Sequence, residues 1–79
     1  MDADTAELHT MDLRQRMADW LMHAKGNRRR AHDYKRAALE YEAAGNLPRY
    51  RQYRIYAERS WRGAWQALRS AKHLRDIVQ

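Results

Sequence analysis

Cysteine is absent from this chain of 79 residues, which also has one proline, three glycines and no phenylalanine. Without cysteine, neither a disulfide framework nor a thiolate metal site can hold the fold, and a reducing, cytoplasmic environment is the expected one. β-branched residues are too scarce to support strands, and no apolar run approaches the roughly 20 residues that span a membrane. The acidic start of the chain does not indicate a secretion signal. We therefore expect one all-α domain over residues 1–79, with no membrane contact.

The charge of the chain is strongly positive and unevenly distributed. The net charge is +6 and the sequence pI is about 10.2. Residues 1–24 contain five acidic residues and two arginines, whereas residues 25–75 contain fourteen basic residues and four acidic ones. Such asymmetry favours an anionic partner. Because a domain this small buries only about 60 % of its unfolded surface, a homodimer or a bound partner would supplement its core.

Apolar residues at spacings of three and four predict helices along the whole chain. The predicted helices cover residues 5–25, 28–44 and 48–77. Gly26 and Asn27 indicate a break, because glycine suits the left-handed position after a helix and asparagine can cap the next one. The alternative is one long bent helix through Gly26, since a single glycine costs only about 1 kcal/mol; we favour the break. Gly45 and Asn46 end the second helix, and Pro48 suits the start of the third. The expected fold is a small three-helix bundle, with its second and third helices in an antiparallel hairpin.

The residues around the second turn resemble a known helical repeat. Over residues 37–57 they follow the pattern A…YE.AGN…Y..Y…A, carried by Ala37, Tyr41, Glu42, Ala44, Gly45, Asn46, Tyr50, Tyr53 and Ala57. This pattern is similar to the hairpin of tetratricopeptide proteins and related three-helix adaptor domains. No second copy occurs in the chain, which excludes a solenoid. The resemblance implies hairpin packing and assigns no functional residue.

Two groups of basic residues are candidates for binding. Three adjacent arginines at a helix start, Arg28–Arg30, could hold phosphates or an acidic protein loop. The alternative is a solvated face that keeps the protein soluble, but only one acid, Asp33, lies nearby, and we favour contact with a partner. In the third helix, Arg51, Arg62 and Arg69 share one outward face, because eleven and seven residues are close to whole numbers of turns.

The aromatic residues divide into core candidates and contact candidates. Trp20 and Trp61 fall on the apolar seams and are expected in the core. Trp65 and Tyr56 fall off the seam, which indicates exposed rings that could stack on bases or anchor a protein interface. The complete set of predicted contact residues is Lys25, Arg28, Arg29, Arg30, Arg51, Arg62, Arg69, Trp65 and Tyr56.

Catalysis and metal binding have no support in the sequence. His9 and His23 are fourteen residues apart, about 21 Å along a helix, so one ion cannot join them. The chain has no readable set of nucleophile, base and orienting residue, and no glycine-rich phosphate loop. We expect no enzyme, no cofactor and no metal. A DNA-reading helix-turn-helix needs apolar residues at set positions around its turn. Both predicted turns have polar residues at those positions, which disfavours this motif.

The function that this sequence favours is binding, and two classes of partner stay open. One is a protein component of a nucleic-acid-handling complex, and the other is DNA or RNA itself, held through its phosphates. In its small size, basic charge and lack of cysteine, the chain is similar to small phage-encoded inhibitors of host defence, including anti-CRISPR proteins. That likeness implies an inhibitor that occupies a partner's surface.

Overall fold

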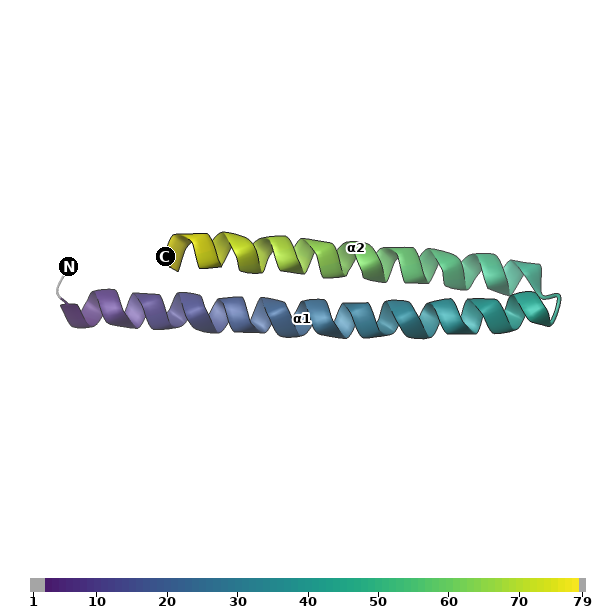
Figure 1. Cartoon of the computed structure of the whole chain (residues 1–79), viewed down its shortest axis with the longest axis horizontal. Helices are drawn as coiled ribbons and strands as arrows, with labels where there is room; N and C mark the ends of the chain where they lie inside the picture. Colours follow the sequence, from purple (N-terminus) through teal and green to yellow (C-terminus); the bar gives the residue numbers. More distant parts are fainter. Residues whose placement is uncertain (1–2, 79) are drawn as a thin grey trace.

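The protein is a long antiparallel hairpin of two helices (Figure 1). The computed structural model describes residues 3–78, with side chains described from residue 7. Helix α1 covers Ala3–Ala43 and helix α2 covers Leu47–Val78. Together they make a rod with Cα extents of 65 × 14 × 13 Å. Neither helix has the length of apolar sequence needed to cross a membrane.

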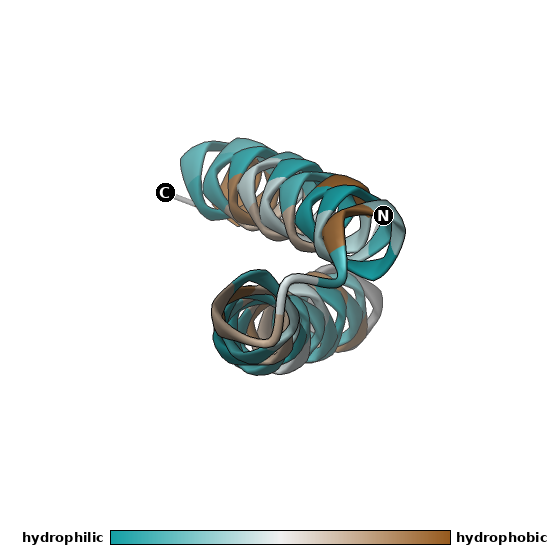
Figure 2. Ribbon diagram, turned by 90° about the vertical axis from the view of Figure 1, so that its right-hand side faces the viewer, coloured by the Kyte–Doolittle hydropathy of each residue, from teal (hydrophilic) through white to brown (hydrophobic). Residues whose placement is uncertain are grey.

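The predicted three-helix bundle is wrong, because α1 continues through the predicted break. Figure 2 shows the two helices side by side, and the described residues contain no further helix. Gly26 and Asn27 both lie inside α1, and the only positive φ among the described residues is that of Gly45. A glycine inside a helix costs about 1 kcal/mol. Packing against α2 on both sides of Gly26 outweighs this cost, so the fused helix is the arrangement that forms.

Alanines form the seam between the helices. On α1 the nearly inaccessible residues Ala24, Ala31 and Ala38 recur every seven residues. On α2 the matching set is Ala57, Ala64 and Ala71, with Ala67 also buried. A seven-residue repeat keeps one stripe of each helix facing the other, as in coiled coils. No large side chain among the described residues is fully buried, so this core is narrow.

Two residues mark the register of the helices and a close approach between them. A Cβ built on Gly63 of α2 would lie 2.9 Å from Nδ2 of Asn27 on α1. The Asn27 side chain is also held by Arg30, whose Nη2 donates a hydrogen bond to Asn27 Oδ1. Asn27 therefore acts inside the helix as a contact residue and does not cap a new helix. The contact also shows why α2 tolerates a glycine at position 63.

The turn at residues 44–46 lies where the sequence predicts it. The N–H of Asn46 donates to the carbonyl of Tyr41 at 2.8 Å, and the N–H of Gly45 donates to that of Glu42 at 3.0 Å. These two bonds form a Schellman motif, with Gly45 in the left-handed conformation at φ 77°. The side-chain Oδ1 of Asn46 then accepts from the N–H of Arg49 at 3.3 Å and caps α2. Backbone hydrogen-bonding groups at the end of α1 and at the start of α2 thus find partners within a turn of three residues.

Tyrosine rings fill the space between the helices near the turn. Tyr53 of α2 lies 5.2 Å from Tyr41, 6.0 Å from Tyr34 and 5.5 Å from Tyr56, measured between ring centroids. Tyr34 and Tyr56 are themselves 5.4 Å apart. Centroid distances in this range are those of favourable aromatic pairs. The four rings form a tyrosine cluster that spans both helices.

Candidate interaction surface

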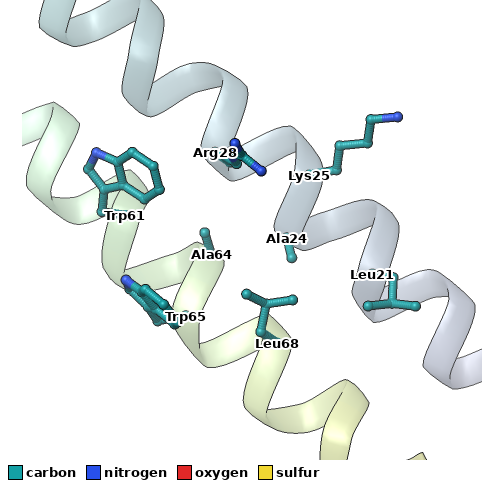
Figure 3. Close-up of a pocket in the computed structure, with 8 residues that line it drawn as sticks. All are labelled: Leu21, Ala24, Lys25, Arg28, Trp61, Ala64, Trp65 and Leu68. Atoms are coloured by element: carbon teal, nitrogen blue, oxygen red, sulfur yellow. The ribbon is translucent and has the colours of Figure 1, made fainter.

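A groove lies between the two helices, midway along α1 (Figure 3). It has a volume of about 510 Å³ and a mostly apolar lining. Its residues recur at spacings of three and four on each helix, and so occupy one side of each. They are Leu21, Ala24, Lys25 and Arg28 of α1 and Trp61, Ala64, Trp65 and Leu68 of α2.

The groove exists because the seam beneath it is made of alanine. Ala24 and Ala64 lie buried between the helices, and their short side chains form the floor of the groove. The indole of Trp65 is therefore left 61 % exposed, and Leu21 and Leu68 are 47 % and 41 % exposed. Small residues that let two helices approach closely thus leave the neighbouring large ones on the surface.

A second hollow, shallow and basic, lies on the outer side of α1. It measures about 520 Å³ and is lined by Lys25, Arg28, Arg29, His32, Asp33 and Arg36. It adjoins the groove, because Lys25 and Arg28 line both. The ring of His32 packs edge-on against Trp61 of α2 with centroids 5.2 Å apart. The basic residues and the apolar groove therefore form one continuous surface, which we call the groove face.

The structure divides the predicted contact residues among three sides of the rod. Lys25, Arg28 and Trp65 lie on the groove face. Arg51 is exposed near the turn end of α2 and does not line the groove. Arg29 lies on the same face, in its basic hollow, whereas Arg62 and Arg69 are exposed on the outer edge of α2.

Arg30 and Tyr56 lie away from the groove face. Arg30 lines neither hollow and donates a hydrogen bond to Asn27. Tyr56 packs in the tyrosine cluster, and its hydroxyl accepts a hydrogen bond from Gln52 Nε2 at 2.8 Å. Because α1 continues through this region, Arg28–Arg30 do not stand together at a helix start. Successive residues on a helix point about 100° apart, so the three arginines project in three directions.

The expected core positions of two tryptophans also differ in the structure. Trp20 is 40 % exposed and packs edge-on against His23, with centroids 5.9 Å apart. Trp61 is half-buried at the groove wall. A groove at this place could not be expected while Trp61 was assigned to the seam, because the buried residues there are alanines. The signal that could have found it is the seven-residue repeat of alanines on both helices, which marks the alanines as the buried positions.

Most of the positive charge on the rod has no acidic partner. Within residues 7–78, the ion pairs are Arg16 with Asp12 at 3.1 Å and Arg75 with Asp76 at 3.7 Å. Both lie near the open end of the hairpin. Glu58, four residues from arginines on either side, forms no ion pair with them. The basic residues of the groove face and of the outer edge of α2 are therefore uncompensated.

Comparison with known proteins adds no relative. No family model matches the chain, and neither a curated protein nor a solved structure is significantly similar to it. In the part of the chain with described side chains, no three histidine or acidic residues gather as a metal site would require. The surface described above is thus what a functional interpretation has to rest on.

Proposed function

We propose that this chain is a non-catalytic binding protein whose basic surface occupies an anionic surface on a protein of a nucleic-acid-handling complex. The observation that carries the proposal is the uncompensated charge. From residue 25 to residue 72, no described basic side chain takes part in an ion pair. Concentrated charge of one sign raises the free energy of the folded state through self-repulsion. An anionic partner removes that repulsion, and occupying such a partner's surface is also how an inhibitor of the anti-CRISPR kind would act.

Two features favour a protein over bare phosphates. The basic hollow contains a carboxylate, Asp33, among its cations, and a phosphate backbone would repel it. The apolar groove with the exposed Trp65 continues from the hollow. Tryptophan and arginine side by side are the residues most enriched in the energetically dominant parts of protein interfaces.

Direct binding of DNA or RNA is the second candidate. It is favoured by the outer edge of α2, where Arg62 and Arg69 stand exposed one heptad apart with no acidic partner. Such arginines could contact phosphates with little preference for sequence. This candidate predicts an accessory protein that coats or bridges nucleic acid.

A pull-down of the tagged chain from its source cell, with and without nuclease, tests the proposal. We expect a protein to be retained after nuclease treatment. Replacing Arg28, Arg29 and Arg30 with alanine should leave the helical circular dichroism unchanged and reduce retention at least tenfold. The matched control removes the same charge elsewhere, by replacing Arg14, Arg16 and Arg75 with alanine. Equal retention of both variants would show that the basic middle of α1 is not the contact.

The salt dependence of binding separates the two candidates. For duplex DNA, the logarithm of the affinity falls linearly with the logarithm of the salt concentration, with a slope of about −0.9 for each phosphate contacted. A protein interface anchored by Trp65 should lose far less affinity between low and physiological salt. A steep slope that is the same for unrelated duplexes would replace the protein partner with nucleic acid.

A further inference from the structure

The groove has the shape of a site for a third helix. Its walls are the sides of two long antiparallel helices, and its floor is the alanine seam. Its lining on α1 extends from Leu21 to Arg28, which is about 10 Å or two helical turns. A helix laid in such a groove would present apolar side chains at positions i, i+3 or i+4, and i+7. Trp65 and Leu68, which the hairpin leaves exposed, are the side chains that it would cover.

The charge around the groove specifies the occupant further. Lys25 and Arg28 stand on its α1 side, and neither forms an ion pair. A helix seated between α1 and α2 would bring its flanking positions close to these cations, and carboxylates there would be favourable. A second copy of this chain also carries a net charge of +6, so pairing two copies would add repulsion.

From this geometry we propose that the groove binds an acidic amphipathic helix of the partner protein, which completes a three-helix bundle. The proposal rests on the proposed function and names the element of the partner that the groove face recognises. The apolar stripe of the helix would supply affinity, and its flanking carboxylates would supply the preference for this groove.

A synthetic peptide tests the proposal without knowledge of the natural partner. The probe is a capped 21-residue alanine-based helix with leucine at heptad a and d positions and glutamate at the flanking e and g positions. We expect saturable one-to-one binding by calorimetry. In a Trp20→Phe background, the fluorescence of the two groove tryptophans should shift to the blue as they lose contact with water.

Variants and matched peptides complete the test. Trp65→Ala should weaken peptide binding at least tenfold, whereas Met22→Ala, an exposed apolar residue outside the groove lining, should leave it unchanged. The same peptide with lysine in place of glutamate should bind at least tenfold more weakly. Absence of binding by the glutamate peptide, or equal binding by the lysine peptide, overturns the proposal. Two other results would also overturn the proposal. One is saturable binding of a single-stranded oligonucleotide to the groove tryptophans, and the other is a dimer in sedimentation equilibrium that depends on Trp65.

Failure of this proposal and failure of the proposed function give different results. If the triple arginine variant loses its cellular partner but the peptide does not bind, the helix in the groove is wrong and the basic-surface function stands. If the peptide binds through Trp65 but the triple variant keeps its cellular partner, the groove is a helix site and the contact assigned to the arginines is wrong.

Discussion

The two ends of the hairpin use their large side chains in opposite ways. Near the turn, four tyrosine rings lie between the helices and contact one another at 5.2–6.0 Å. Around the groove the buried residues are Ala24 and Ala64, and Leu21, Trp65 and Leu68 lie on the surface. The same class of residue thus stabilises one end and is left available for binding at the other. Buried alanines run through both regions, with Ala38 and Ala57 beside the tyrosine rings and Ala24 and Ala64 beneath the groove. The difference is in the rings themselves, because the tyrosines of the two helices contact one another.

The variants with the largest expected effect remove one aromatic ring from each end of the hairpin. Tyr53→Ala deletes the ring that contacts three other tyrosines. We expect a loss of about 2–4 kcal/mol, somewhat below the cost for a fully buried aromatic residue. Trp65→Ala should change stability by only about 0.5 kcal/mol, because the ring is mostly exposed. Thermal or denaturant unfolding followed by circular dichroism measures both; equal losses would mean that the two ends do not differ.

A substitution in the alanine seam tests the close approach of the helices. Ala67→Leu inserts a branched side chain at a position only 1 % exposed, and overpacking of this kind costs about 1–3 kcal/mol. The neighbouring Gln66→Leu makes a side chain of the same size at an exposed position. It should leave the denaturation midpoint nearly unchanged. A seam that accepts the leucine at no cost would show that the helices are not tightly packed there.

The smallest expected change in stability concerns alanine substitutions at two glycines inside the helices. A Cβ at Gly26 would meet only the end of the Arg30 side chain at 3.7 Å, so Gly26→Ala should stabilise the protein by about 0.5–1 kcal/mol through helix propensity. At Gly63 the same change must displace Asn27, whose Nδ2 would lie 2.9 Å away. We expect the gain there to be cancelled.

Adding Asn27→Ala to Gly63→Ala supplies the control for this pair. With the obstructing amide removed, the second alanine should recover the gain seen at position 26. If Gly63→Ala alone stabilises the protein as much as Gly26→Ala, the register defined by these two residues is incorrect.

The turn could be predicted from the sequence, whereas the continuity of α1 could not. Gly45 and Asn46 satisfy the helix ends through local hydrogen bonds, and local signals of this kind are visible in sequence. Gly26 and Asn27 carry a similar local signal, yet the outcome there depends on Ala24 and on Gly63 across the hairpin. A contact between residues so far apart in the chain cannot be deduced from spacing.

The residues of the candidate surface also divide into those whose positions could be predicted from the sequence and those whose positions could not. The exposure of Trp65 follows from its position off the seam and was predicted correctly. The position of Tyr56 in the tyrosine cluster depends on Tyr34 of the other helix, and this was missed. From Ala57 the seam of α2 can step three residues to Ser60 or four to Trp61. Hydrophobicity favours the tryptophan, whereas in the structure both residues are half-buried.

One consequence of the unequal helices concerns how the rod opens. The contact of Asn27 with Gly63 places the end of α2, Val78, opposite residue 12 of α1, so residues 3–11 extend past it. This extension is shorter than the roughly 12–15 residues at which an isolated helix becomes stable in water. The rod therefore has a gradient of local opening, easiest at the extension and hardest at the tyrosine cluster. A partner helix bound midway along the rod would reduce local opening in the half that opens first. Binding would therefore also reduce opening at residues far from the groove.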